Sequence, residues 1–327
     1  MSLGLHYLRK NNEFLIRMKI CYSLADIQDA LSALPQGKTI SFVPTMGALH
    51  NGHISLIKTA LQYSDIVVAS IFVNPTQFNN RTDLATYPRT EEEDCKRLQE
   101  AGTSIIFIPS VKEIYPAEDR RVFDFEGLDK VGEGPRRPGH FNGVAQVVTR
   151  LFDIIKPDYA LFGEKDFQQL AIIRHFSQKM GYPVRIIASP TIREEDGLAM
   201  SSRNMLLSPE QREAAPHIYR VLQRAQQIAR ELLADNEQKI INQKQLKNST
   251  HTEPDRQVSC CNMTPIQLAE WVIKEIDSNP LLEAEYVEIV NSLTLQIVND
   301  WDEAESIQLC TAVFAKPVRL IDNIKLK

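Results

Sequence analysis

Two histidines three residues apart mark the stretch of this chain best suited to chemistry. His50 and His53 end the segment 42–53, which reads FVPTMGALHNGH. Apolar residues then recur at helical spacing at Ile54, Leu56, Ile57, Ala60 and Leu61, which predicts a helix that begins near the pair. A helix N-terminus presents free N–H groups and a positive dipole end, and residues three apart share one helix face. The stretch therefore predicts a phosphate site to which both imidazoles can donate.

Other interpretations of the pair stay open at this point. The two rings could satisfy local hydrogen bonds only, or they could bind a metal ion. Histidine pairs that bind zinc on a helix usually stand four residues apart with a third ligand, whereas no Cys or Glu cluster accompanies this pair. Gly47 and Gly52, which permit tight backbone, and the strand–turn–helix context favour contact with a phosphate.

Alternating strand-like and helix-like segments surround this stretch and would position it. Continuous apolar runs of this kind are typical of parallel strands covered on both faces, and the alternation predicts a Rossmann-like, doubly wound parallel sheet. In such sheets ligands bind at the carboxyl ends of the strands. The expected strands are 39–43, ended by Pro44, then 65–73, 104–108, 159–162 and 184–188; the expected helices are 90–101, opened by a capping box of Thr90 and Glu93, then 141–155 and 166–180.

A smaller α+β domain is predicted to follow and to cover the first. We place the boundary at 190/191, which gives domains 1–190 and 191–327. Capping boxes at Ser208–Gln211 and Thr264–Gln267 predict helix starts, the first helix running to about residue 233. Residues 235–263 are polar and lack aromatics, which predicts a surface insertion. The segments 284–291, 307–315 and 318–321 are expected to be strands.

Composition limits the classes of function. The chain has 327 residues, 43% hydrophobic and 24% charged, with a net charge of −5, which suits an enzyme of about two domains. A mildly acidic chain does not indicate general nucleic-acid binding, and no apolar run approaches a membrane span. Five cysteines without a C-x-x-C spacing favour a reduced, cytoplasmic protein. Residues 1–17 lack a sustained apolar core and do not read as secretory, although an organelle signal stays possible and Met18 could be an alternative start.

Seven segments resemble one known family in order along nearly the whole chain. The pattern His-x-Gly-His resembles the nucleotidylyltransferase superfamily, and the longer strings resemble its pantothenate synthetases (pantoate–β-alanine ligases). The matching segments are 44–53 (PTMGALHNGH), 70–78 (SIFVNPTQF), 87–90 (YPRT), 138–144 (PGHFNGV), 162–170 (FGEKDFQQL), 196–204 (DGLAMSSRN) and 319–323 (RLIDN). The resemblance implies a ligase that joins pantoate to β-alanine with ATP and Mg²⁺, through a pantoyl adenylate, in a homodimer.

The resemblance also assigns roles to individual residues. The implied catalytic residues are His50, His53, Lys165, Ser201, Ser202 and Arg203, which would stabilise phosphate charge. The implied ATP site adds Met46, Gly47, Gly52, Gly163, Asp166, Ile192 and Met200. Pantoate would contact Pro44, Thr45, Met46, Gln77 and Gln169, because a glutamine amide both donates and accepts hydrogen bonds. Asn74 and His140 would shape the site, and Asp94 would assist the metal. Taken one at a time, Lys165 could be a solvated surface lysine, and the polar residues could be ordinary turn or linker residues.

Three competing functions share part of the pattern. A plain nucleotidylyltransferase would release an adenylylated product without needing an amine, but the segments around Gln77 and Gln169 favour the ligase. A class I aminoacyl-tRNA synthetase would carry an anticodon-binding module and a lysine in the loop where this chain has Arg203. A nucleotide sensor without activity could lack Gln77 or Lys165, and both are present.

Overall fold

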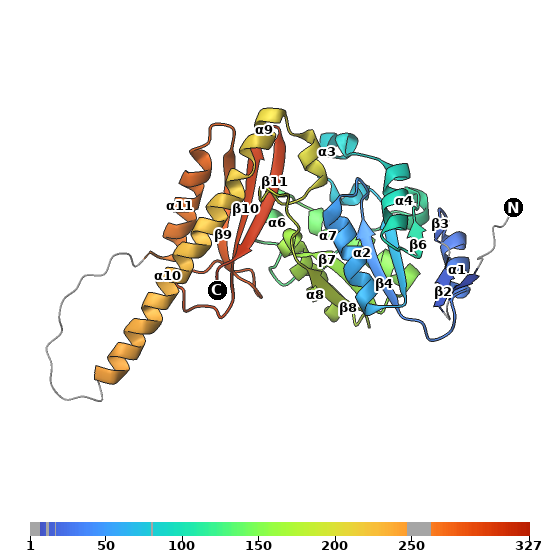
Figure 1. Ribbon diagram of the computed structural model, residues 1–327, viewed down its shortest axis with the longest axis horizontal. Helices are drawn as coiled ribbons and strands as arrows, with labels where there is room; N and C mark the ends of the chain where they lie inside the picture. The colour runs from blue at the N-terminus through green and yellow to red at the C-terminus, as the bar shows by residue number, and fades with distance from the viewer. Residues whose placement is uncertain (1–6, 11–12, 17, 80, 247–262) are drawn as a thin grey trace. The chain divides into compact units, whose positions relative to one another are not determined.

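The computed structural model describes residues 7–10, 13–16, 18–79, 81–246 and 263–327, which form two compact units (Figure 1). The first unit comprises Met1–Glu194 and Ala199–Met205, and the second comprises Glu195–Leu198 and Leu206–Lys327. Residues 191–194 and 199–205 thus belong to the first unit, although the expected boundary placed them in the second. They return to it because Met200 N–H donates to the Ile192 carbonyl at 3.0 Å and Arg193 pairs with Ala199.

A six-stranded parallel sheet forms the centre of the first unit. Its strand order is β3-β6-β5-β4-β7-β8, and every neighbouring pair is parallel. The strands are β3 (Lys19–Cys21), β4 (Ile40–Thr45), β5 (Ile66–Ile71), β6 (Ile105–Phe107), β7 (Tyr159–Gly163) and β8 (Arg185–Ser189). Two further strands, β1 (Tyr7–Lys10) and β2 (Glu13–Ile16), pair antiparallel as a separate sheet. The sequence analysis did not anticipate β1, β2 or β3.

Helices cover both faces of the sheet. On one face α2 and α4 contribute Ile57 and Leu98 to a cluster with Val43 of β4. On the other face α1, α7 and α8 pack against Phe42 of the same strand, because successive side chains of a strand point to opposite faces. This confirms the doubly wound class. The helices of the unit, including short 3₁₀ turns, are α1 (Leu24–Ser32), α2 (Asn51–Tyr63), η1 (Pro75–Gln77), α3 (Arg81–Thr86), α4 (Glu91–Glu100), α5 (Val111–Ile114), α6 (Glu133–Arg136), α7 (His140–Ile155), η2 (Glu164–Asp166) and α8 (Phe167–Lys179).

Pro44 lies inside β4 rather than ending it, which corrects the expectation from sequence. The carbonyls of Thr39 and Thr45 accept from β5 and its flanks, whereas the Ile40 carbonyl accepts from Asp158 beside β7. Odd-numbered residues of β4 therefore bond toward β5, and even-numbered residues bond toward β7. Pairing with β7 stops at Phe42, so the missing N–H of Pro44 falls where no partner strand requires it.

The early end of that pairing opens the sheet at one place. β4 stays paired to β5 through Thr45, but it pairs with β7 only at Ser41 and Phe42. Strand order also reverses here, because β5 lies on one side of β4 and β7 on the other. Such a switch point is where doubly wound sheets bind ligands.

The start of α4 also differs from its predicted form. Thr90 is the N-cap residue, but its side chain makes no capping hydrogen bond. Glu93, which would complete a capping box, instead pairs with Arg97 one turn later at 3.0 Å. The helix begins at the expected place without that box, and its first turn carries four acidic residues, which suit the positive end of the helix dipole.

The second unit packs helices against a three-stranded antiparallel sheet. The sheet order is β11-β10-β9, and both α11 and α10 supply buried residues such as Leu268 and Leu222 to its core. The elements are η3 (Ser202–Leu206), which begins in the first unit, α9 (Pro209–Ala214), α10 (His217–Leu246), α11 (Pro265–Asp277), β9 (Glu283–Asn291), β10 (Ile307–Ala315) and β11 (Val318–Lys325). The small α+β class is confirmed.

Two expectations for the second unit need correction. Both capping boxes are present, but the helix expected over 208–233 is two helices, because Pro216 interrupts the chain between α9 and α10. Residues 235–246, expected in a surface insertion, continue α10. The rest of that predicted insertion up to 262 lies outside the described residues. None of the described helices is long and apolar enough to cross a membrane.

One glycine fixes how closely α7 approaches the turn that carries Gln77. A Cβ on Gly143 would stand 2.3 Å from the Thr76 carbonyl oxygen and 2.7 Å from the Gln77 nitrogen. The Gly143 carbonyl itself accepts from the Asn74 side chain at 3.1 Å. This contact between α7 and η1 leaves no room for a side chain.

We therefore expect Gly143→Ala to lower the free energy of unfolding by about 1–3 kcal/mol through overpacking. Alanine in a helix interior would otherwise be stabilising, so the sign of the change is diagnostic. Urea denaturation would measure it. Gly163→Ala is the control, since its added Cβ meets nothing within 4 Å and its φ of −75° suits alanine. Equal stability of the Gly143 variant and the natural protein would contradict the packing argument.

Candidate functional site

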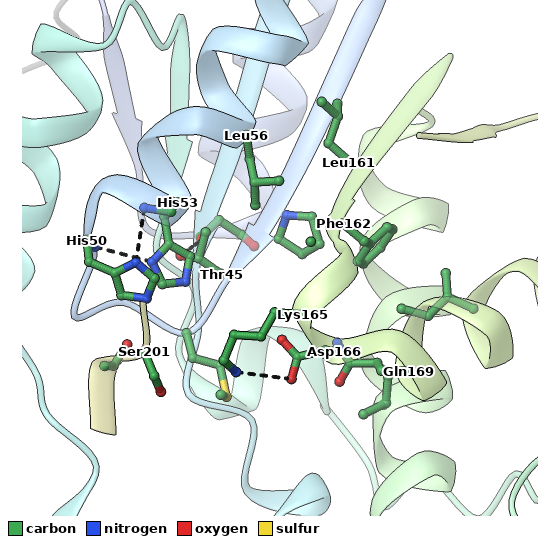
Figure 2. A pocket seen from close by; sticks show the side chains of 18 of the residues that line it. Thr45, His50, His53, Leu56, Leu161, Phe162, Lys165, Asp166, Gln169 and Ser201 are labelled. Atoms are coloured by element: carbon green, nitrogen blue, oxygen red, sulfur yellow. Dashed lines mark hydrogen bonds and ion pairs between the residues drawn. The ribbon is translucent and has the colours of Figure 1, made fainter. Parts of the chain in front are cut away.

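A pocket lies where β4 and β7 separate, and all of its walls come from the first unit (Figure 2). Thr45 ends β4, and Phe162 stands near the end of β7. Loops and helix starts beyond these strands supply the polar residues. The polar and charged lining residues are Thr45, His50, His53, Ser70, Asn74, Gln77, Tyr87, Lys165, Asp166, Gln169, Thr191, Ser201, Ser202 and Arg203.

The histidine pair forms its own capping box at the start of α2. His50 is the N-cap residue, and its Nδ1 accepts from the Gly52 N–H at 3.1 Å. The Nδ1 of His53 accepts from the His50 N–H at 3.3 Å. The rings lie 4.1 Å apart between centroids, side by side in Figure 2. Because a nitrogen that accepts a hydrogen bond carries no proton, both rings have their proton on Nε2 when neutral.

Both rings are neutral at ordinary pH. Desolvation, with a smaller contribution from the nearby Lys165 charge, lowers the pKa of His50 to about 4. Desolvation lowers the pKa of His53 well below its usual value, and His50 and Lys165 add to this. A neutral imidazole with a fixed Nε2–H is a hydrogen-bond donor that needs no net charge. Both histidines line the pocket and can therefore donate to an anionic oxygen there.

The backbone at this helix start is less available than the sequence predicted. We expected free N–H groups of α2 to meet the phosphate. The N–H groups of His50 and Gly52 are instead used by the two imidazoles, and the His53 N–H donates to the His50 carbonyl at 2.9 Å. The two imidazoles therefore occupy two of the backbone donors at this turn.

Cationic groups stand at two other places along the pocket. Lys165, on η2 directly after β7, is 18% exposed and lies 3.9 Å from an oxygen of Asp166, the ion pair dashed in Figure 2. The Nη2 of Arg203 donates to both oxygens of Asp83 on α3, at 2.9 and 3.2 Å. The Arg203 guanidinium also lies 5.8 Å from the centre of the Tyr87 ring. Each cation is thus paired with a carboxylate, and both side chains still line the pocket.

The pocket lining also includes the glutamines predicted to bind pantoate. Gln77 is 9% exposed; its Oε1 accepts from Asn74 at 3.2 Å, and its Nε2 contacts the sulfur of Met46 at 2.8 Å. His140 holds the backbone of the same turn, because its Nδ1 lies 2.8 Å from the Gln77 carbonyl. Gln169 lines the pocket from α8, whereas the neighbouring Gln168 binds the carbonyls of Leu128 and Val131 and serves the fold.

The structure brings most of the predicted residues together and leaves three outside the lining. Gly47, Asp94 and His140 do not line the pocket. Asp94 is 1% exposed and accepts from the backbone of Ala48 and Leu49, and its expected contact with a metal stays a prediction. The residues that do line it are Pro44, Thr45, Met46, His50, Gly52, His53, Asn74, Gln77, Gly163, Lys165, Asp166, Gln169, Ile192, Met200, Ser201, Ser202 and Arg203.

Sequence reasoning missed the apolar wall that α7 contributes to the pocket and two of the pocket's hydroxyls. Val144, Val147, Val148 and Leu151 of α7 all line it. Their spacing marked one face of a helix, but spacing cannot tell a face that packs on a sheet from one that faces a pocket. Ser70 and Tyr87 stand in segments that carried the family resemblance, and Ser70 Oγ is buried without a hydrogen-bond partner.

The pocket offers few oxygen ligands of its own to a magnesium ion. Magnesium takes oxygen ligands and is commonly held by one or two carboxylates together with substrate phosphates. Asp166 is the one carboxylate among the described residues that line the pocket. No group of three or more His, Cys, Asp or Glu side chains that could hold a metal ion occurs in the described part of the chain. The pocket therefore fits a magnesium ion that arrives on the phosphates of a nucleotide.

Known proteins are similar to this chain in sequence and in fold. The sequence model of the pantoate-beta-alanine ligase family matches residues 19–325. Pantothenate synthetase of Porphyromonas gingivalis is 46% identical over 94% of this chain and 99% of its own length. That of Bacteroides thetaiotaomicron is 45% identical over 95% of this chain and 99% of its own.

Solved structures agree with these sequence relatives. The pantothenate synthetase of Thermus thermophilus has a TM-score of 0.79 and 36% identity, covering 94% of this chain and 99% of its own. The pantoate-beta-alanine ligase of Francisella tularensis, solved with beta-gamma ATP and beta-alanine, has a TM-score of 0.71 and 32% identity, covering 95% and 98%. Because the family model matches residues 19–325 and these relatives match nearly the whole chain, the chain belongs to the pantoate–β-alanine ligase (pantothenate synthetase) family.

Proposed function

We propose that this protein joins pantoate to β-alanine in an ATP-dependent reaction that passes through a pantoyl adenylate. The observation that carries the proposal is the composition of one pocket. Neutral Nε2–H donors from His50 and His53, together with Lys165, share it with Gln77 and Gln169 and with an apolar wall. Phosphate donors and an organic-acid site in one cavity suit the activation of a carboxylate by a nucleotide.

The first step is the attack of a pantoate carboxylate oxygen on the α-phosphorus of ATP. The bond from the α-phosphorus to the bridging oxygen breaks, and pyrophosphate leaves with its electron pair. This in-line displacement depends on positioning and on stabilising charge at the phosphate oxygens. The Nε2–H groups and the Lys165 ammonium supply such stabilisation, while Ser201 and Arg203 are assigned to the departing phosphates. Magnesium on those phosphates would neutralise further charge.

The second step is the attack of the β-alanine amine on the activated carbonyl carbon. An amide bond forms, the carbon–oxygen bond to AMP breaks, and the amine loses a proton. Water would compete for the same carbonyl, so the site must exclude it. Val144, Val147, Val148 and Leu151, each no more than 6% exposed, make that wall apolar. The amide of Gln77, held by Asn74 and Met46, is fixed to bind the hydroxyls of pantoate.

Three further expectations belong to this proposal. They are a requirement for Mg²⁺, a homodimer and a cytoplasmic location. The first two stay predictions from the family resemblance, and the third stays a prediction from cysteine usage. The pocket composition supports the first of them, because Asp166 alone among its described lining residues could add a carboxylate to a nucleotide-bound ion.

Pyrophosphate release distinguishes the ligase from its alternatives. With ATP, Mg²⁺ and pantoate alone, we expect a burst of one pyrophosphate per site, because the adenylate stays bound. Adding β-alanine should give steady turnover and pantothenate, detected by mass. Steady release of an adenylylated product without the amine would identify a nucleotidylyltransferase instead, and ATP binding without any pyrophosphate would identify a sensor.

Lys165→Ala should lower kcat/KM. The loss should correspond to at least ~1.5–3 kcal/mol of transition-state stabilisation, which is the scale of one charge-assisted hydrogen bond. The fold should persist, since the Lys165 side chain serves the pocket. Lys179→Ala on α8 is the matched control, because that lysine is exposed and pairs with Asp124 and Glu126. A folded Lys165 variant with the turnover of the natural protein would remove this residue from the mechanism.

The neutral state of His50 also predicts a pH dependence of stability. Its pKa is about 4 in the folded protein and about 6.5 when unfolded, so between these values the unfolded state binds more protons. Stability therefore falls as pH drops from 6.5 toward 4. His50→Asn keeps an N-cap residue and removes this titration. Between pH 7 and 5 the free energy of unfolding, measured by urea denaturation, should therefore fall by up to about 2 kcal/mol less in the variant than in the natural protein. Between pH 7 and 8 both proteins should behave alike, and parallel curves down to pH 5 would contradict a buried neutral ring.

A further inference from the structure

The turn before His50 places one alanine in a backbone conformation that alanine does not favour. Gly47 has a φ of +81°, and Ala48 follows with a φ of +49°. A left-handed alanine is uncommon, because its Cβ crowds the neighbouring carbonyl. Such conformations persist only where surrounding contacts hold them. Since Leu49 leads directly into the N-cap His50, whatever holds this turn also sets the direction of the imidazoles.

A buried carboxylate holds the turn from one side. Asp94 Oδ2 accepts from the Ala48 N–H at 2.9 Å, and Oδ1 accepts from the Leu49 N–H at 2.7 Å. A Cβ on Gly47 would stand 3.0 Å from Asp94 Oδ2, so the turn closes around the carboxylate. Successive N–H groups in such a turn form a concavity that attracts anions. Here the anion is the protein's own side chain, 1% exposed.

A hydroxyl group binds Ala48 from the other side. Ser202 Oγ donates to the Ala48 carbonyl at 3.0 Å, and Ser202 is itself 7% exposed. Ala48 is therefore clamped through both of its backbone groups, by Asp94 and by Ser202. This clamp joins the histidine turn to the Ser201–Arg203 segment, although about 150 residues separate them in the sequence.

Asp94 is well placed to act as a fixed anchor. It lies in the first turn of α4, and its N–H donates to the Thr90 carbonyl at 2.8 Å. The positive end of the helix dipole favours a carboxylate at this position. Leu98, one turn later and fully buried, packs with Ile57 and Leu56 of α2. The anchor thus belongs to a helix that packs beside the helix that carries His53.

We propose that Asp94 is a positioning residue of the reaction, which fixes the Gly47–Leu49 turn and thereby aims the Nε2–H groups of His50 and His53 at the phosphates. The inference rests on the proposed function for its kinetic consequence. It gives the carboxylate a role in place of the predicted contact with a metal. It also explains why the phosphates would meet imidazoles in this turn: the carboxylate already occupies the N–H groups of Ala48 and Leu49.

Asp94→Asn is the sharpest test, because it keeps the shape and turns one acceptor into a donor that faces a backbone N–H. We expect kcat for pyrophosphate release to fall roughly 100-fold, as for a small misplacement of catalytic groups. The KM for pantoate should change less than kcat, since Gln77 and Gln169 lie on η1 and α8. Glu93→Gln, which removes the adjacent but exposed carboxylate, should leave kcat unchanged. A folded Asp94→Asn variant with unchanged kcat would overturn the inference.

A second readout does not depend on ligase activity. Nitrogen-15 NMR of the histidine rings should show His50 and His53 as neutral Nε2–H tautomers in the natural protein and in Glu93→Gln. In Asp94→Asn at least one ring should lose that fixed tautomer or titrate at a higher pH. Unchanged ring spectra in a folded Asp94→Asn variant would reject the role of Asp94, whether or not the natural protein turns over. If instead the rings change but the natural protein forms no pantothenate, the proposed function fails and the positioning role stands.

A double-mutant cycle tests the clamp itself. If Asp94 and Ser202 act through the same residue, the combined variant Asp94→Asn with Ser202→Ala should lose less in kcat than the product of the two single losses. Fully multiplicative losses would show that the two side chains act independently, and would overturn the shared action on Ala48.

Discussion

The site depends on where one strand stops pairing. β4 is held along its whole length by β5, but β7 leaves it after two residue pairs. Continued pairing would have closed the sheet and required an N–H at Pro44. Because the strands separate there, the ends of β4 and β7 become two walls of a pocket, and the helix starts that follow both strands point their polar side chains into it. The cavity thus forms where β4 and β7 stop pairing, next to Pro44, which has no N–H to donate.

In and around that cavity, several polar groups are held by protein partners before a substrate enters. The two imidazoles cap their own helix and so fix which nitrogen carries the proton. Asp83 holds Arg203, Asn74 holds Gln77, and Asp94 holds the turn before His50. Such preorganisation lowers the cost of ordering side chains during the reaction. It also explains why few of these groups can be judged from sequence alone, since each acts through a partner that is distant along the chain.

Much of the candidate site was nevertheless predictable. His50, Lys165 and Gln77 lie at or after the ends of expected strands, and ends of parallel strands must meet at one edge of a sheet. The assignment of Gln169 rather than Gln168 to the pocket rested on the family resemblance, and the structure gives the reason: Gln168 points its amide at carbonyls of a neighbouring loop. Asp94 shows the limit of such reasoning. An acidic residue in an active-site motif suggested a metal ligand, whereas its burial against two backbone N–H groups is the observation behind the positioning role proposed for it.

Sequence by itself determined the fold class and most of the elements that surround the site. The apolar runs, the glycines of the histidine turn and two of the three predicted capping boxes act over a few residues, so their meaning survives without tertiary contacts. Only the tertiary structure decided which side of β4 tolerates Pro44, which face of α7 lines the pocket and which acceptor the N–H of Ala48 finds. The physical reason is that these outcomes depend on groups dozens of residues away in the chain, and neither periodicity nor propensity carries information over that distance.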